Sequence, residues 1–233
     1  MKRLAAIVLI LTMFTASGFI ASGCAWFKGK HEMEKSAETL VREGSSQFRN
    51  RDFKDAIKSF TTLKDWYPFS KYAILAELKI ADAHFQLKEY DEAIFAYQDF
   101  ENLHPKNEAI PYIIYQTGRC WFERIDTVDR DQSSTLKALT EFNRLIQRFP
   151  DAPESARAAE HVEVCIKSLA GHELYVAEFY FKAKYYKAAM KRFEHLFANF
   201  PDTREGKDAL ARIAECREMI AQGKDRGKDV VLE

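Results

Sequence analysis

One spacing recurs four times along the chain and limits the possible folds more than any other feature. An Ala is followed four residues later by an aromatic residue, and eight residues after that by a Pro. The four copies are Ala56/Phe60/Pro68, Ala93/Tyr97/Pro105, Ala138/Phe142/Pro150 and Ala189/Phe193/Pro201. Residues four apart share one face of a helix, so the small Ala marks a close helix crossing and the aromatic ring fills the space beside it. The Pro then ends the helix.

A small residue also precedes each copy, on the stretch where a first helix would run. These residues are Gly44, Ala81, Gly118 and Ala177. Two antiparallel helices per unit, with small residues at their crossing, are typical of tetratricopeptide repeats. We therefore predict an all-α, right-handed α-solenoid of tetratricopeptide-like helix hairpins. It would have about nine to ten helices in five repeats, with the last repeat acting as a cap.

The repeats are not uniform, because the Pro-to-Pro spacings are 37, 45 and 51 residues. We expect an insert around 126–134 in the third repeat and a long first helix in the fourth, bent near Gly171. The expected helices are 34–49, 53–66, 71–87, 90–103, 109–123, 134–148, 154–183, 186–199 and 204–221.

The N-terminal stretch has the features of a secretory signal peptide. A basic Lys2-Arg3 pair precedes an apolar run too short to span a membrane comfortably, and small residues lead up to Cys24. This arrangement resembles a bacterial lipobox, in which lipid (diacylglycerol and palmitate) is joined to the Cys. Ala25 follows rather than Asp, which favours the outer membrane. An ordinary signal peptide with a coincidental Cys is the alternative.

These features divide the chain into five segments. We predict a removed signal peptide at 1–23 and a lipidated Cys with its tether at 24–33. N-terminal repeats one to three would occupy 34–150, and C-terminal repeats four and five 151–222. The charged stretch 223–233 lacks a hydrophobic period and is expected to be a flexible tail.

Charge and motifs argue against several classes of function. Removing residues 1–23 takes away Lys2 and Arg3 and no acid, which leaves 33 basic and 35 acidic residues. That balance gives no support to nucleic-acid binding. No phosphate loop, HExxH, CxxC or GxSxG motif occurs, so we predict no catalytic residue, no metal and no cofactor beyond the lipid on Cys24.

The remaining cysteines and histidines have weaker interpretations. Cys120, Cys165 and Cys216 are far apart, and buried free thiols are favoured over a disulfide, whose pairing the spacing does not fix. His161 and Cys165 are one helical turn apart, but two ligands are too few for a structural zinc site, and a chance pair is favoured.

Several strings resemble the BamD (YfiO, ComL) family of outer-membrane assembly lipoproteins. They are Trp66–Phe69 (WYPF), Val128–Gln132 (VDRDQ), Tyr175–Tyr180 (YVAEFY) and Asn199–Thr203 (NFPDT). Together with the lipobox and the repeat layout, the resemblance runs from about residue 36 to 220. The insert is shorter than in the enterobacterial form, and the tail is shorter and charged.

The resemblance implies a non-enzymatic scaffold of the β-barrel assembly machine, lipid-anchored on the periplasmic face of the outer membrane. Its partners would be a BamA-like POTRA–barrel protein, docked on the C-terminal half, and unfolded outer-membrane proteins, received by the N-terminal half. Accessory lipoproteins are further candidate partners, and the departures in the insert and tail put those contacts in question.

The repeat register suggests which side chains face the concave groove. They are Phe48, Asp82, Phe85, Tyr112, Tyr115, Arg119 and Phe122. Aromatic rings and one Arg suit a peptide that ends in an aromatic residue and a carboxylate, because Arg binds carboxylates in a bidentate manner. The alternative is that these aromatics belong to the core between repeats.

For the partner interface we predict Arg192, which should point outward from a second helix, with Tyr185 and Tyr186 nearby. A solvated Arg on an exposed face is the alternative. The Asp129-Arg130-Asp131 string is either an ion-paired brace for the insert or a partner contact.

Two other functions compete with the assembly scaffold. One is a periplasmic repeat lipoprotein that serves as an adaptor recruiting cell-wall enzymes, and the other is an enzyme or metal carrier. Co-purification of a POTRA–barrel protein separates the first from the scaffold, and metal analysis tests the second.

Overall fold

The computed structural model describes residues 35–227, and this part of the chain contains nine α-helices and no strand. In chain order the helices are α2 (Ala37–Arg49), α3 (Phe53–Trp66), α4 (Ala73–Gln86), α5 (Tyr90–Leu103), α6 (Ile110–Phe122), α7 (Ser133–Arg148), α8 (Pro153–Lys182), α9 (Tyr186–Asn199) and α10 (Arg204–Ala221). The predicted Cys24, signal peptide and tether lie outside the described residues.

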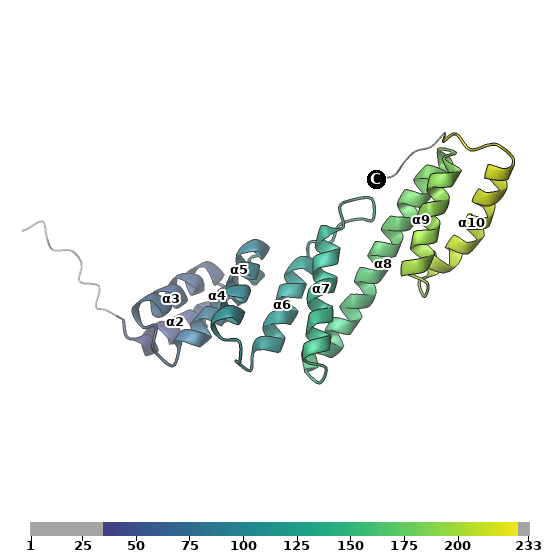
Figure 1. Ribbon diagram of the computed structural model, residues 1–233. Coiled ribbons are helices and arrows are strands. Elements are labelled where there is room, and N and C mark those ends of the chain that lie inside the picture. The colour runs from purple at the N-terminus through teal and green to yellow at the C-terminus, as the bar shows by residue number, and fades with distance from the viewer. Residues whose placement is uncertain (1–34, 228–233) are drawn as a thin grey trace, which may run out of the picture.

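The helices stack side by side into an elongated solenoid, from α2 at one end to α10 at the other (Figure 1). Each helix packs against the next in sequence, and the first helices α6, α8 and α10 also contact one another in order. The all-α solenoid is confirmed, with four hairpins followed by α10. None of the described helices has both the length and the apolar character needed to cross a membrane.

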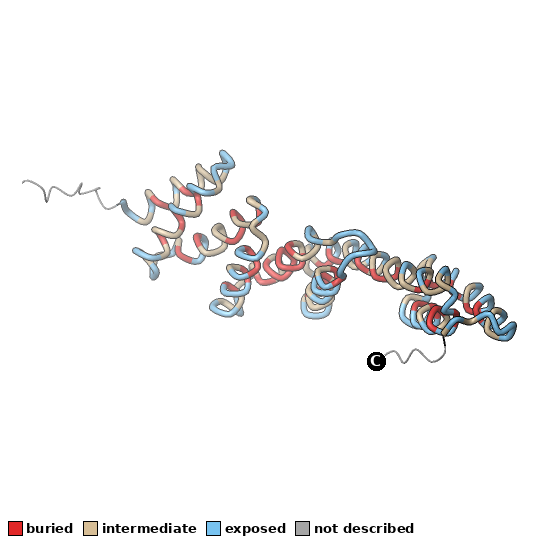
Figure 2. Tube along the Cα trace, turned by 90° about the horizontal axis from the view of Figure 1, so that it is seen from above, coloured by how far each residue is buried: buried red, intermediate tan, exposed pale blue. Residues whose placement is uncertain are grey.

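The repeated Ala and aromatic positions form the centre of each hairpin. The four repeated Ala residues and the four aromatic residues have no exposed surface: they are Ala56, Ala93, Ala138 and Ala189, with Phe60, Tyr97, Phe142 and Phe193. The preceding small residues face these rings. A Cβ atom at Gly44 would lie 2.9 Å from the Phe60 ring, and one at Gly118 would lie 2.6 Å from the Phe142 ring. Buried positions consequently run through the middle of the stack along its length (Figure 2).

The turns within three hairpins share one conformation. Arg51, Lys88 and Lys184 each adopt a left-handed backbone, with φ of 66°, 61° and 66°. In each turn the next residue donates its N–H to a carbonyl five residues back, as in Asp52 to Gln47 at 2.9 Å. This bonding satisfies carbonyls at the helix end without a glycine. The third hairpin lacks this turn and carries the insert instead.

The insert is held against α8, and this contact explains Gly171. A Cβ at Gly171 would lie 2.9 Å from Val128, and the Val128 carbonyl oxygen lies 2.7 Å from His172 Nδ1. α8 runs without interruption from Pro153 to Lys182, through Gly171. The glycine allows the close approach of the insert.

A buried amide, more than the predicted ion pair, fixes the shape of the insert. Gln132 Nε2 donates to the carbonyls of Thr127 and Arg130, while its Oε1 accepts from Thr135 and from Ser168 of α8. In contrast, Arg130 and Asp129 are 4.0 Å apart and exposed. Exposed pairs of this kind contribute little to stability.

Three core clusters follow one another along the solenoid, and α8 takes part in two of them. The cluster of repeats two and three runs from Ala81 to Cys165, and the C-terminal cluster runs from Ala170 to Cys216. A smaller cluster around Phe60 fills the first repeat. The N-terminal core thus continues past the expected division at 150–151 into the first half of α8.

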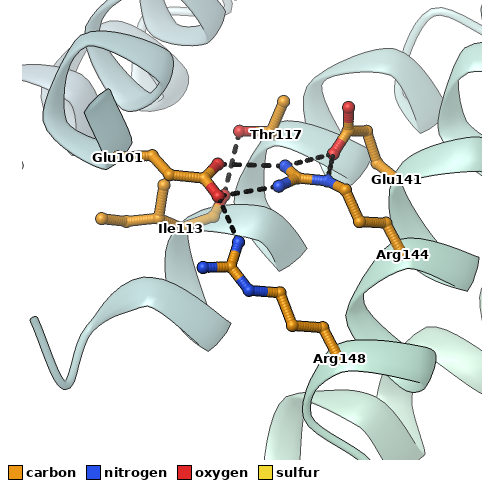
Figure 3. Close-up of polar contacts among 6 residues, drawn as sticks. All are labelled: Glu101, Ile113, Thr117, Glu141, Arg144 and Arg148. Carbon is orange, nitrogen blue, oxygen red and sulfur yellow. Dashed lines mark hydrogen bonds and ion pairs between the residues drawn. The ribbon is translucent and has the colours of Figure 1, made fainter. Parts of the chain in front are cut away.

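An ion-pair network joins the second helices of repeats two and three. Glu101 of α5 accepts hydrogen bonds from Arg144 at 2.7 and 3.1 Å and from Arg148 at 2.8 Å, and Arg144 also pairs with Glu141 (Figure 3). Burial opposes ionisation of Glu101, but the hydrogen bonds from Arg144 and Arg148 outweigh it and lower its pKa. The network fixes α5 relative to α7 across the repeat boundary.

Candidate functional site

A small cavity of about 160 Å³ opens between α2, α4 and α6, where the groove was predicted. Four of the residues that line it were predicted for the groove, namely Phe48, Asp82, Phe85 and Tyr112. The other four are Lys79, Gln86, Tyr97 and Gln116. These side chains come from three successive first helices and one second helix, so only stacking of the repeats brings them together. The structure therefore assembles part of the predicted groove.

Asp82 is the polar centre of this cavity. Its Oδ1 accepts hydrogen bonds from the hydroxyls of Tyr97 and Tyr112, both at 2.8 Å, and its Oδ2 pairs with Lys79 at 2.8 Å. Burial and the Asp82 charge raise the pKa of both tyrosines, which therefore remain donors. Because Asp82 is 6% exposed and fully engaged, it ties α4, α5 and α6 together instead of offering a free carboxylate.

Gln116 supplies an unused polar atom in the same cavity. Its Nε2 donates to the Tyr112 hydroxyl at 2.8 Å, but its buried Oε1 has no hydrogen-bond partner. A buried acceptor without a donor costs about 1–3 kcal/mol. Because this oxygen has almost no exposed surface, a ligand reaches it only if the side chain moves. Gln116 was not predicted from the sequence, because an isolated Gln on a helix carries no distinctive pattern.

Arg119 lies beside the cavity with its charge already partly used. Its guanidinium sits 4.7 Å from the centre of the Phe85 ring, and Nη2 bonds Glu123 at 2.8 Å. This pair is solvent-accessible, so it contributes at most about 1 kcal/mol and exchanges readily for another carboxylate. Arg119 thus retains the capacity to bind an acidic group while Phe85 holds it in place.

Tyr115 and Phe122 belong to a separate aromatic cluster, and for them the core alternative is the better description. Tyr115 is 7% exposed, its hydroxyl lies 3.2 Å from His161 Nε2, and Phe122 and Phe142 pack on the same imidazole. The prediction that Tyr115 lines the groove is wrong, because this ring fills the space between repeats three and four. Phe122 is half-buried in the same cluster.

His161 is part of that cluster rather than of a metal site. Burial and the nearby Arg119 charge lower its pKa, so the imidazole is neutral near pH 7. Cys165 is fully buried, and burial raises its thiol pKa to about 11. No group of three or more potential metal ligands occurs within residues 35–227. Cys120, Cys165 and Cys216 are all free and buried, which agrees with the favoured interpretation of these thiols.

The predicted docking residues of repeat four separate into different environments. Arg192 of α9 is partly exposed and pairs with Glu173 of α8 at 3.3 Å, and His195 lies 3.5 Å from the same carboxylate. Tyr185, in the turn before α9, is 36% exposed. Tyr186 is 7% exposed and packs edge-on against Phe181, so its assignment to a partner surface is wrong.

The segment after α10 returns to this same turn. Asp225 Oδ1 accepts from the Lys187 N–H at 3.3 Å, and the Arg226 N–H donates to the Lys184 carbonyl at 2.9 Å. A carboxylate at the first turn of a helix satisfies an otherwise unpaired N–H and favours the helix dipole. Residues 223–227 were expected to belong to a flexible tail, but they are bonded to the α8–α9 turn.

An exposed aromatic pair on α8 was not foreseen as a surface. Tyr175 is 50% exposed and Phe179 62%, and their four-residue spacing puts them on one face. This face lies opposite Ala177, which is buried in the C-terminal core. Tyr175 and Phe179 belong to the YVAEFY string that carries part of the family resemblance. Because apolar residues occur on several faces of α8, its sequence does not indicate which face stays exposed.

The chain also resembles known proteins in sequence. Residues 33–228 match the family model described as "YfiO: Outer membrane lipoprotein". The outer membrane protein assembly factor BamD of Rickettsia prowazekii is 28% identical over 211 residues, covering 91% of this chain and 84% of that protein. The BamD of Neisseria meningitidis serogroup A is 28% identical over 186 residues, covering 76% and 70%. With most of its length matched by the family model, the chain belongs to the YfiO family of outer membrane lipoproteins.

Proposed function

We propose that this chain is a non-enzymatic scaffold for the assembly of outer-membrane proteins, anchored by lipid on Cys24 to the periplasmic face of the outer membrane. Family membership and the name of the Rickettsia relative, outer membrane protein assembly factor, support the role. The observation that carries it is the division of one solenoid into a polar, partly open N-terminal groove and a C-terminal surface with exposed aromatic and charged side chains.

The start of the described chain is consistent with anchoring at Cys24. The Tyr67 hydroxyl donates to the Lys35 carbonyl at 3.0 Å, so the chain enters the solenoid beside the loop that follows α3 and carries Phe69. Lys35 is the eleventh residue after Cys24, and that length of chain reaches at most roughly 40 Å. A lipid on Cys24 would hold the first repeat near the membrane and leave the C-terminal half extending away from it.

In this proposal the N-terminal groove receives the C-terminal segment of an unfolded outer-membrane protein. An apolar or aromatic side chain would lie between Phe48 and Phe85, and the terminal carboxylate would replace Glu123 at Arg119. Releasing Glu123 costs little, whereas the new bond pairs a full carboxylate with a guanidinium held by Phe85.

Fluorescence anisotropy with a labelled ten-residue peptide ending in Phe tests the groove. We expect Arg119→Ala to weaken binding about tenfold and Glu123→Gln to strengthen it severalfold, because that change frees the guanidinium. The same peptide with a C-terminal amide should bind the wild-type protein weakly. Equal affinity for acid and amide, or no change in Glu123→Gln, would exclude Arg119 as the carboxylate site.

The C-terminal surface around Arg192 and Tyr185 is the proposed contact for a BamA-like POTRA–barrel protein. Detergent pull-down of tagged protein from native membranes tests both the role and the place. The wild-type protein should recover a large POTRA–barrel protein, and Arg192→Ala should recover less of it. The control Arg204→Ala should recover as much as wild type, because Arg204 is exposed on α10 and pairs within its own helix. Recovery of cell-wall enzymes without a barrel protein would favour the adaptor function instead.

The anchor is tested separately by Cys24→Ala. We expect this variant to leave the membrane fraction while its groove still binds the peptide. Unchanged fractionation with membranes would refute lipidation at Cys24.

A further inference from the structure

A second cavity lies on the other side of α4 from the groove. It encloses about 430 Å³ and is bounded by α3, α4 and α5. On α4 it is lined by Glu77, Ile80 and His84, whereas the groove uses Lys79, Asp82 and Gln86. At roughly 100° per residue these two sets point to opposite faces of the helix. The cavity is therefore a separate site, within the size range of about 300–1,000 Å³ of binding pockets.

Its floor is apolar and its outer wall is an uncovered aromatic ring. Ile80, Ala96 and Phe100 line the cavity, and Phe95 beside them is 74% exposed. A single exposed Phe is ordinary on a protein surface. Here the ring borders a hollow with an apolar floor, so an apolar side chain entering the cavity would be covered on several sides.

The rim carries an excess of negative charge that the fold does not neutralise. Asp91 pairs with Arg124 at 2.5 Å, and Glu77 lies 2.7 Å from His104. Within the described chain, neither Glu92 nor Asp99 makes an ion pair or a side-chain hydrogen bond. Lys64 is the one Lys or Arg among the residues that line the cavity.

The spacing of the two unpaired carboxylates, Glu92 and Asp99, indicates the kind of partner that would pair with them. Glu92, Phe95 and Asp99 lie on one stripe of α5, with an acid about one turn on either side of the ring. Seven residues along a helix correspond to about 10.5 Å. A partner helix with Lys or Arg seven residues apart and a large apolar residue midway between them has the matching geometry.

We propose that this acidic–aromatic cavity is a docking site for a basic amphipathic helix of a partner protein. Its apolar residue enters the cavity beside Phe95, and its two cations pair with Glu92 and Asp99. The site is independent of the peptide groove and of the surface around Arg192. The cavity and the groove lie on opposite faces of α4, and Arg192 lies two repeats away on α9, so binding at one of these sites does not block the others.

Binding of a designed probe by the full chain tests this proposal. The probe is a labelled fourteen-residue helical peptide of Ala, Leu and Lys, with Lys at two positions seven apart and Leu midway between them. A scrambled peptide of the same composition controls for general attraction. We expect Phe95→Ala to weaken probe binding about tenfold. Glu92→Gln/Asp99→Asn should weaken it about three- to tenfold and reduce its salt dependence.

A matched variant separates this site from adsorption to any acidic surface. Glu160→Gln/Glu163→Gln removes two exposed carboxylates of α8 and should leave probe binding unchanged. Equal binding of the scrambled peptide, or an equal loss in the α8 variant, would overturn the proposal. Circular dichroism melting checks that Phe95→Ala is folded, which its exposure leads us to expect.

The natural occupant is tested by placing a photo-crosslinking phenylalanine analogue at position 95 in cells. Mass spectrometry of the product should find a peptide with basic residues flanking an apolar one in a helical segment. Crosslinking only to neutral or acidic segments would refute the proposed chemistry. Since neither measurement depends on recovery of a barrel protein, this site and the proposed function can fail separately.

Discussion

The two halves of the solenoid are built on the same hairpin but differ in what they bury. Within residues 35–227, every buried polar side chain lies at or before Ser155. Those include Asp82 and Gln132, which bond side chains of neighbouring helices, and Gln116, which bonds Tyr112 within α6. The C-terminal core, from Ala170 to Cys216, is apolar throughout.

This difference has a physical consequence for recognition. Buried polar groups require partners at defined positions, so they fix how helices sit relative to one another and prepare a groove of definite shape. An apolar core stabilises without specifying polar geometry. Large apolar side chains are exposed in both halves, for example Phe95 in the N-terminal half and Phe179 in the C-terminal half. The halves therefore differ in their buried polar contacts, which suit the N-terminal half to holding a ligand site of fixed shape.

Paired core truncations are the strongest test of how separate the halves are. Phe142→Ala and Phe193→Ala each remove a fully buried ring at the same register position, so each should lower the free energy of unfolding by about 3–5 kcal/mol. Hydrogen exchange should show lost protection in α6, α7 and the first half of α8 for Phe142→Ala. Phe193→Ala should affect the second half of α8, α9 and α10. Equal loss of protection along the whole chain for both would mean that the halves unfold as one unit.

Removing the polar centre of the N-terminal half should have the next largest effect. Asp82→Ala leaves the buried Tyr97 hydroxyl without its acceptor, and we expect a loss of about 2–3 kcal/mol in urea unfolding. Asp82→Asn keeps an acceptor and should cost less. The control is Asp208→Ala, because Asp208 is exposed on α10. It should change the free energy of unfolding by less than about 0.5 kcal/mol. A loss in Asp82→Ala no greater than in the control would contradict a structural role for this carboxylate.

Acid should weaken the N-terminal half through Glu101. Its folded pKa is lowered, so the stabilisation is present above the unfolded value, near 4.5, and is lost as the pH falls below it. Because the network is partly solvent-exposed, we expect a contribution of only about 1 kcal/mol. Urea unfolding between pH 3 and 7 should show a shallower pH dependence in Glu101→Gln. An unchanged pH profile would show that Arg144 and Arg148 do not stabilise the ionised form.

The smallest expected effect concerns the end of the C-terminal half. Asp225→Ala removes the acceptor for the Lys187 N–H and should cost about 0.5–1 kcal/mol. Exchange of amides in the first turn of α9 should quicken, while α4 and α6 stay unchanged. No change at α9 would show that the contact does not cap the helix in solution.

Sequence reasoning predicted the helices well because their signals are local. The Pro residues and hairpin turns bracket the helices, and the expected limits agree with the structure within three residues at each end. The site was harder to predict. Phe48 and Phe85 line the cavity between α2, α4 and α6, whereas Tyr115 and Tyr186 have the same aromatic character and are buried in the core. Residue type and register alone do not distinguish an aromatic that faces a groove from one that the next repeat covers.

The sequence by itself determined the hairpin, its Ala–aromatic crossing and the order of the repeats, because four-residue periodicity and proline stops act within one or two helices. Only the tertiary structure decided what lies between repeats. It placed Tyr97 and Tyr112 on Asp82, seated Val128 over Gly171, returned Asp225 to α9 and left Phe95 uncovered. These contacts join residues far apart in the chain, and they depend on the rotation and offset between successive hairpins, which no local pattern encodes.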